Sequence, residues 1–257
     1  SDIDGENAND KFGASVAISS DGKTIAGGAI YNDGGANNSG HVRIYTYNTN
    51  SSEWEQKGND IDGKAASDSA SVVALNNSGS RVAIGGPSND DGAQNAGHVR
   101  IFDYVDGSWI QIGADLNGGS IDEEFGASVD LNSDGNIVAV GSNFPNSNGK
   151  ARVFKYDNNT WSILGSEING ESLGDNFGRS ISINDSGTRL AVGGSKNDGN
   201  GTDSGHVRVF DYIDGSWVQI GSDLDGEAAG DNFGHSVSLS SDGSRLAVGA
   251  HFNDGNG

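Results

Sequence analysis

The sequence of 257 residues predicts an all-β fold, a β-propeller built from four-stranded blades of about 55 residues. Three observations lead to this prediction. A Phe-Gly pair begins a similar stretch of sequence four times, and long stretches recur almost unchanged in distant segments. In each copy the apolar residues also alternate with the two-residue period of β-strands. No segment has the 3.6-residue period of an amphipathic helix, so α/β folds are set aside.

The copies start near residues 12, 69, 125, 177 and 233. The Phe-Gly pairs are Phe12-Gly13, Phe125-Gly126, Phe177-Gly178 and Phe233-Gly234, and Ser69-Ala70 takes their place in the second copy. The texts of 97–104 (GHVRIFDY) and 205–212 (GHVRVFDY) differ at a single position. Agreement of this kind identifies an internal repeat.

The first two strands of each copy are expected directly after Phe-Gly. Apolar residues alternate there, as at Val129 and Leu131, which is typical of a strand with one face inward. A turn such as Asp134-Gly135 follows, where glycine supplies the positive φ of a tight hairpin. The second strand is a continuous run of small apolar residues, for example 137–141, which indicates a strand covered on both faces.

The third strand alternates again, as in 98–104, and the fourth begins at a tryptophan. These residues are Trp54, Trp109, Trp161 and Trp217, and we expect them to pack between sheets. A unit of four such strands cannot be stable alone, whereas copies stacked around an axis cover both faces of every sheet, as in a propeller. A β-solenoid is the alternative, but its coils usually need nearer to about 20 residues.

We expect one propeller domain or fragment over residues 1–257, with residues 1–11 as the tail of a preceding copy. Residues 1–5 match 222–226, and the fifth copy lacks its third and fourth strands. Two interpretations stay open: a five-repeat ring with one incomplete blade, or a window onto a longer array. The incomplete blade also suggests self-assembly, because its open seam can accept a strand from another subunit.

The order Phe-Gly, strand, turn and Gly-Ala or Gly-Pro resembles the FG-GAP repeat of integrin-type propellers. Gly28-Ala29, Gly85-Gly86-Pro87 and Gly249-Ala250 stand at the second half of that motif. The resemblance covers the whole chain and is closest in character to arrays in secreted or surface proteins of marine microbes and algae. It implies a propeller fold. Calcium-binding members carry Asp-x-Asp-x-Asp-Gly-x-x-Asp between the first two strands, and here a short turn such as 241–244 replaces that loop.

Composition narrows the classes of partner. Asp and Glu number 36 against 15 Lys and Arg, a net charge of −21, which disfavours nucleic acid and anionic membrane surfaces. The chain has no cysteine, so disulfides, thiolate metal sites and thiol nucleophiles are excluded. No apolar run approaches the roughly 20 residues that span a bilayer, so we expect no membrane insertion.

The candidate ligand sites are Asn/Asp/Gly-rich loops between the second and third strands. Their candidate residues are Asp33, Asp90, Asp91, Asp198, Asn200, Asp203 and Asp254. Long loops on one face of a rigid repeat are where propellers commonly bind partners. The same residue types also form loops readily, so a purely structural role is the alternative.

A second candidate is the set of Asp-x-Asp or Asp-x-Asn segments ahead of the Phe-Gly positions, such as Asp60/Asp62 and Asp223/Asp225. Oxygen ligands at alternate positions suit Ca²⁺. The third Asp of a calcium loop is missing, and turn capping explains the same carboxylates. We therefore expect no metal and no cofactor, with calcium as the open alternative.

No catalytic residue is identified. His41, His98 and His206 recur at one strand position, where the remaining complete copy has Lys150, and such repetition is more typical of packing than of catalysis. No Ser-His-Asp order, metalloprotease helix motif or P-loop is present. The sequence therefore predicts that the protein is not an enzyme.

The function expected from these features is an extracellular or cell-surface, non-enzymatic propeller that acts in adhesion, surface coating or assembly. The alternative is a lectin-like or calcium-dependent module that uses the Asn/Asp-rich loops. The expected partners are a protein or a glycan at the propeller face, together with further copies of the chain at the incomplete blade.

Overall fold

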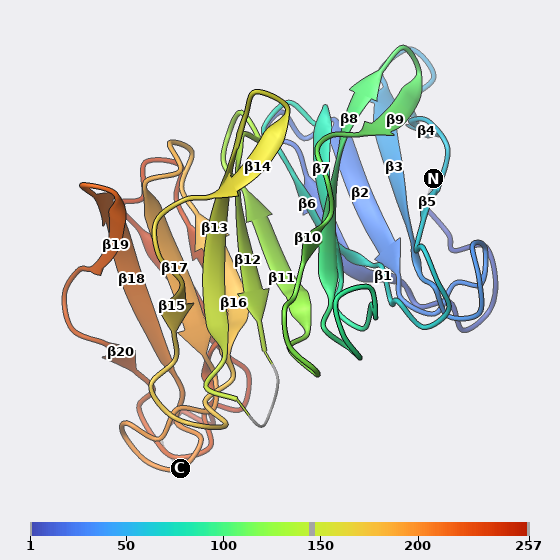
Figure 1. Ribbon diagram of the computed structural model, residues 1–257. Helices are drawn as coiled ribbons and strands as arrows, with labels where there is room; N and C mark the ends of the chain where they lie inside the picture. Colours follow the sequence, from blue (N-terminus) through green and yellow to red (C-terminus); the bar gives the residue numbers. More distant parts are fainter. Residues whose placement is uncertain (1, 144–146, 256–257) are drawn as a thin grey trace. The chain divides into compact units, whose positions relative to one another are not determined.

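The computed structural model describes residues 2–143 and 147–255, and these residues form strands, turns and loops without any helix (Figure 1). Five antiparallel sheets follow one another along the chain, four with five strands and one with two. This arrangement confirms the predicted all-β repeat fold of the propeller type. None of the described residues belongs to a helix long and apolar enough to cross a membrane.

The sheets take their strands in chain order. The first contains β1 (Phe12–Ile18), β2 (Thr24–Ala29), β3 (His41–Asn48), β4 (Glu53–Gln56) and β5 (Ile61–Asp62). The second contains β6 (Val72–Leu75), β7 (Arg81–Gly86), β8 (His98–Val105), β9 (Ser108–Gln111) and β10 (Leu116–Asn117). The third contains β11 (Phe125–Leu131), β12 (Ile137–Ser142), β13 (Lys150–Asp157), β14 (Thr160–Ile163) and β15 (Ile168–Asn169). The fourth contains β16 (Phe177–Ile183), β17 (Arg189–Gly194), β18 (His206–Ile213), β19 (Ser216–Gln219) and β20 (Leu224–Asp225), and the fifth contains β21 (Phe233–Leu239) and β22 (Leu246–Ala250).

Each complete sheet has a two-residue fifth strand that the sequence did not predict. Three of these strands come from the Asp-x-Asp or Asp-x-Asn segments and β15 comes from Glu167-Ile168-Asn169. Each pairs with the start of the third strand, as β20 does with β18 at His206 and Val207. The fourth strand pairs with the end of the same third strand, as β19 does with 210–213. The fifth strands bring the first acid of each segment close to the first residue of the third strand.

Contacts divide the chain into two compact units. Unit 1 comprises Ser1–Gly126 with Asp157–Trp161, and unit 2 comprises Ala127–Tyr156 with Ser162–Gly257. In unit 1, Val73 and Leu75 of β6 pack with Val42 of the first sheet. In unit 2, Ile181 and Ile183 of β16 pack with residues of the third sheet in the same way. Within each unit, the first strand of one repeat therefore covers the sheet of the repeat before it.

A β-bulge explains why phenylalanine is followed by glycine. The pairing of β1, β16 and β21 with their neighbours shifts register just after the Phe. Gly13, Gly178 and Gly234 take φ values of 87°, 88° and 86°, which favour glycine because it has no Cβ. In the second repeat the residue at the Phe position is Ala70, one residue later than the expected Ser69. The amide of Ala70 donates to the carbonyl of Ser39, and the amides of Phe125 and Phe233 donate in the same way to the carbonyls of Ala96 and Ser204.

Burial follows the predicted pattern. Val82, Ala83 and Ile84 of β7 are fully buried, as expected for a second strand covered on both faces. Val16 and Ile18 of β1, in contrast, are 73% and 61% exposed, because no sheet precedes β1 among the described residues of unit 1.

Consecutive sheets within a unit are joined by specific polar contacts. The amide of Ile183 on β16 donates to Asp130 Oδ2 on β11 at 2.8 Å. Trp217 Nε1 donates to the carbonyl of Leu164 in the preceding repeat at 2.8 Å. The seams are also narrow, because a Cβ added at Gly193 would meet the carbonyl oxygen of Gly234. Trp161 and Trp217 are 8% and 7% exposed, which agrees with the predicted packing role and leaves neither ring as an exposed platform.

Candidate functional site

Three of the predicted ligand residues hold their own loops together. Asp33 Oδ1 accepts a hydrogen bond from the amide of Asn38 at 2.7 Å, and Asp198 Oδ1 accepts one from the amide of Asp203 at 2.9 Å. Asp90 makes the same contact five residues along its loop at 2.7 Å. Each carboxylate closes a loop whose last part includes a residue with positive φ. These contacts give the three side chains a structural role.

A second contact fixes the loops to the connection that precedes each repeat. Asn32 Nδ2 donates to Asp10 Oδ2 at 2.8 Å, and Asn89 Nδ2 donates to Asp68 Oδ1 at 3.1 Å. All four side chains are buried. The acids that stand just before the Phe position are therefore paired with amide donors of the protein.

The other predicted residues lie in different repeats and do not converge on one point. Asn200 Nδ2 donates to the carbonyls of Gly226 and Glu227 at 2.8 and 3.1 Å. Asp91 Oδ2 accepts a hydrogen bond from Lys64 Nζ at 2.6 Å. Asp254 lies in the exposed loop after β22.

A polar pocket of about 580 Å³ lies in unit 2, at the loop end of the fourth sheet. It is lined by the loop of residues 171–176 and by residues 196–199, 202 and 203. Of the predicted ligand residues, Asp198 and Asp203 line it. Glu171 and Lys196 add a negative and a positive group, and Leu173, which is 77% exposed, supplies an apolar surface.

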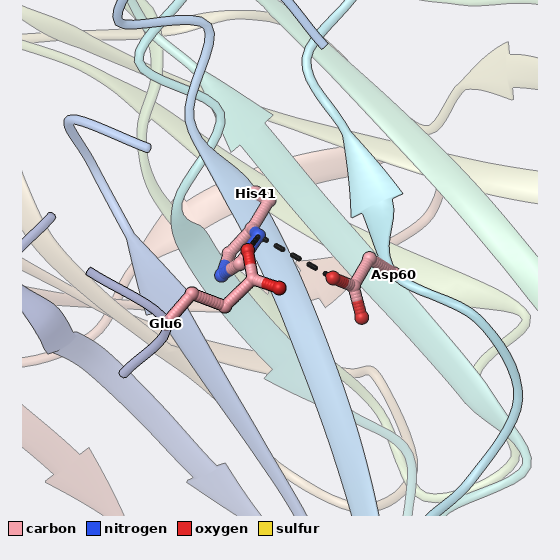
Figure 2. A group of neighbouring side chains, drawn as sticks. All are labelled: Glu6, His41 and Asp60. Atoms are coloured by element: carbon pink, nitrogen blue, oxygen red, sulfur yellow. Dashed lines mark ion pairs between the residues drawn. The ribbon is translucent and has the colours of Figure 1, made fainter. Parts of the chain in front are cut away.

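Beside these loops, a buried histidine faces two carboxylates in three of the repeats. The groups are Glu6/His41/Asp60, Asp91/His98/Asp115 and Glu171/His206/Asp223, and within each group one ligand atom per residue lies within 4.8 Å of the others. Figure 2 shows the first group, in which the imidazole of His41 faces carboxylates from two separate segments. His41 Nδ1 is 3.7 Å from an oxygen of each carboxylate, and His206 Nδ1 is 3.6 Å from Asp223 Oδ2.

The histidines are held in a neutral form. Burial lowers the pKa of His41 and of His206, and it lowers the pKa of His98 to about 4, although the neighbouring carboxylates act in the opposite direction. Neither ring nitrogen of these three residues has a hydrogen-bond partner among the described residues. A neutral imidazole in this position has a lone pair available for a cation.

The groups differ in the positive charge that the chain itself provides. Lys64 Nζ bonds both carboxylates of the second group, at 2.6 Å from Asp91 and 2.8 Å from Asp115. In the third repeat, Lys150 replaces the histidine and its Nζ lies 3.5 Å from Glu167 Oε2.

In the first group, Arg43 pairs with both Glu6 and Asp60. In the fourth repeat, Arg208 bonds Gln219 and the carbonyl of Asn169, and its Nε is 3.8 Å from Asp223 Oδ1.

These contacts also bear on the expected calcium alternative. The first acids of the Asp-x-Asp segments face a histidine and an arginine or lysine, while their second acids lie within the two-residue strands. The sequence suggested the acids of these segments but missed their partners Glu6, Glu171 and Lys64. One signal was available, because these three residues all follow the glycine that ends the segment.

The sequence matches the model of the FG-GAP repeat at residues 3–45, 169–210 and 222–257. These three segments are FG-GAP repeats, which confirms the resemblance inferred from the Phe-Gly pattern. No curated protein matches the chain at a significant level.

Solved structures of similar fold come from several bacteria. The periplasmic gluconolactonase of Pseudomonas aeruginosa is 16% identical, with a TM-score of 0.59 over 92% of this chain and 64% of that protein. A protein of Bacteroides fragilis named as a 6-phosphogluconolactonase is 16% identical, with a TM-score of 0.58 over 91% of this chain and 56% of that one. Hydrazine synthase of Kuenenia stuttgartiensis is 14% identical, with a TM-score of 0.56 over 91% of this chain and 70% of that one. The chain thus spans less than two thirds of both lactonases.

These similarities correct the prediction that the protein is not an enzyme. Lactonases use this fold, so the lack of a familiar catalytic motif does not exclude catalysis here. The prediction was wrong because it assumed that repeats with similar sequences have the same chemical surroundings at every position. Asp130, Lys64 and Lys150 each occur in one repeat and make the repeats chemically different. At 14–16% identity the similarity establishes the fold alone.

Proposed function

We propose that this FG-GAP repeat chain is a ligand-binding module of a secreted or cell-surface protein, and that the pocket of unit 2 binds a glycan. The single observation that carries the proposal is the composition of this pocket. Its carboxylates and hydroxyl groups suit sugar hydroxyls, and the exposed Leu173 offers an apolar surface to the C–H face of a sugar ring.

Two acids of the pocket are available for a ligand. Asp175 is buried and accepts hydrogen bonds from Asn197 and from the amide of Ser172, and Asp198 closes its loop. Glu171 and Asp203 line the pocket, and neither carboxylate accepts a hydrogen bond from a described residue. The FG-GAP repeats and the net charge of −21 support a location outside the cell, where a soluble acidic surface and glycan partners are common.

The test is binding to a glycan array, followed by calorimetry with the best ligand and the Asp203→Asn variant. Asn38 and Asn95 occupy the equivalent position in two other loops with φ values of 49° and 47°, so Asn fits the backbone of Asp203. We expect Asp203→Asn to weaken binding about tenfold or more, the loss of one charge-assisted hydrogen bond. The matched control is Asp214→Asn, which removes the same charge at a positive-φ residue of the β18–β19 hairpin.

Gluconolactone, from which the Pseudomonas aeruginosa enzyme takes its name, belongs in the same ligand panel. Its hydrolysis with a loss of rate in Asp203→Asn would add turnover to binding at this pocket. The glycan proposal is wrong if no glycan binds, or if the control and Asp203→Asn weaken binding equally.

A further inference from the structure

In the Glu171/His206/Asp223 group, one imidazole faces two carboxylates. The donors that the chain supplies there lie at the other oxygen of Asp223, since Gln219 Nε2 donates to Oδ1 at 2.6 Å and Arg208 Nε is 3.8 Å from it. His206 Nδ1 lies 3.6 Å from Asp223 Oδ2, which is too long for a hydrogen bond. No described residue hydrogen-bonds to the carboxylate of Glu171. We propose that Glu171, His206 and Asp223 bind a zinc ion.

The spacing of the ligand atoms fits this ion. Zn–N and Zn–O bonds of about 2.0–2.2 Å at a tetrahedral centre place two ligand atoms about 3.4 Å apart. The observed 3.6 Å between His206 and Asp223 is close to this value. Glu171 is exposed, and a side-chain movement of about 1 Å brings its oxygen, now within 4.8 Å of the other two atoms, into the same shell.

Burial supplies an independent argument. His206 is fully buried, and both of its ring nitrogens lack a hydrogen-bond partner among the described residues. Its Nε2 edge lies against Gly194, where an added Cβ would be 2.7 Å away, so that edge is filled by the protein. Nδ1 faces the carboxylates. An unpaired polar group in the interior is costly, and a bound cation removes that cost.

The other repeats show what occupies this position when the chain provides its own cation. Lys64 Nζ stands between the carboxylates of the second group, and Lys150 takes the place of the histidine in the third repeat. Arg43 bonds both acids of the first group. In the fourth repeat, Glu171 stands where the second repeat has Lys64, since Glu171 follows the glycine of Glu167-Ile168-Asn169-Gly170 and Lys64 follows the glycine of Asp60-Ile61-Asp62-Gly63. The fourth repeat thus has an acid at the position where the second repeat has a lysine.

The donor set selects zinc rather than calcium. Calcium takes six to eight oxygen ligands and seldom a histidine, whereas one imidazole and two carboxylates suit Zn²⁺. Three protein ligands leave the fourth position of the zinc free for water or another ligand. Glu171 also lines the pocket of unit 2, so this position opens beside the proposed glycan site. The zinc site does not depend on that site being a glycan site.

The experiment is zinc titration of the full chain by calorimetry, with the Co²⁺ absorption spectrum as a second measurement and Ca²⁺ as a comparison. All proteins carry His251→Gln, because His251 and His235 stack with ring centres 4.0 Å apart and imidazole is a common zinc ligand, so this substitution excludes the pair as a second zinc site. We expect one zinc per chain, a tetrahedral Co²⁺ spectrum and no calcium binding. Glu171→Lys, which places a lysine at the position that Lys64 has in the second repeat, is expected to bind no zinc while keeping the melting temperature.

The reverse substitution is expected to create a zinc site, a result that misfolding of the variant cannot produce. Lys64→Glu leaves His98, Asp91 and Asp115 with an additional acid and without the ammonium group, and we expect it to bind two zinc ions per chain. The proposal is overturned if the starting protein does not bind zinc, if Glu171→Lys binds it unchanged, or if folded Lys64→Glu gains no second ion. These measurements use no sugar, so they succeed or fail independently of the glycan assay.

Discussion

Asn197 Nδ2 donates a hydrogen bond to Asp175 Oδ2 at 3.0 Å, and this contact connects the loop before β18 to the connection before β16. Asp175 is 3% exposed and Asn197 is 6% exposed, so the bond lies inside the protein. The same pair recurs as Asn89 with Asp68. Residues that resemble ligands in the sequence thus fix the geometry of the loops that surround the pocket.

Asn197→Ala should destabilise the protein, because the carboxylate of Asp175 stays buried and loses a donor. We expect a loss of about 1–3 kcal/mol in the free energy of unfolding, measured by urea denaturation. Asn253→Ala is the matched control. Asn253 makes the same bond at 2.9 Å to Asp231, which is also 3% exposed, but Asn253 itself is exposed, so water can replace its amide and the substitution should cost less. Equal losses in the two variants would contradict the role of burial.

Asp130 predicts a pH dependence of stability. Burial against the next repeat raises its pKa from 3.8 to about 6, despite the hydrogen bonds from the amides of Ile183 and Leu131. Between about pH 4 and 6 the folded state keeps a proton that the unfolded state has released. This contribution to stability is therefore complete below about pH 4 and is lost as the pH rises through about 6.

Asp130→Asn removes this dependence. Its stability relative to the parent protein should rise by on the order of 2 kcal/mol between pH 4 and pH 7, measured by urea denaturation at both values. The exposed Asp157→Asn serves as the control for the loss of one charge. A constant difference between Asp130→Asn and the parent at all pH values would refute the prediction.

Trp217→Phe tests the hydrogen bond across a seam within unit 2. Phenylalanine keeps most of the buried ring but cannot donate to the carbonyl of Leu164, so we expect a loss of about 1 kcal/mol. Trp54→Phe is the control, because Trp54 Nε1 donates to no described residue, and it should change stability by less than about 0.5 kcal/mol. Thermal unfolding followed by circular dichroism compares the two, and indistinguishable melting temperatures would refute the contribution of the bond.

Gly85→Ala tests the close approach of the second and third repeats within unit 1. The added Cβ would collide with the backbone carbonyl of Gly126, which cannot move like a side chain, so we expect a loss of about 3 kcal/mol or more. At Gly119 the nearest atom to a new Cβ is Glu123 Oε2 at 3.9 Å, and Gly119→Ala should be nearly neutral. Soluble yield and urea midpoints measure both variants, and a stable Gly85→Ala protein would show that the seam can widen.

The sequence was sufficient for the fold because its evidence is local and repeated. Alternation at residues such as Val129 and Leu131, the Asp-Gly turns and the Phe-Gly bulge each occupy only a few positions. The fifth strands were missed because two residues are too few to show a period. Their pairing depends on the third strand, which lies some twenty residues earlier in the chain.

The sequence was less informative about the candidate sites because their partners are distant in the chain. Glu171 precedes the repeat that starts at residue 177, His206 lies within that repeat and Asp223 lies near its end, so no single motif contains all three. The loop acids Asp33, Asp90 and Asp198 were proposed as ligand residues on composition, and composition cannot distinguish an acid that binds a ligand from one that caps its own loop.

The close backbone contacts between neighbouring repeats at Gly85 and Gly193 have a consequence for how the sequence can diverge during evolution. Because contact between neighbouring repeats runs through backbone at these points, side chains of the loops away from the packed sheets can vary without altering how the next repeat stacks. Loop chemistry can diverge from one duplicated copy to another while the architecture stays constant. Lys64 and Glu171 can therefore give two repeats of one chain different chemistry at the same position.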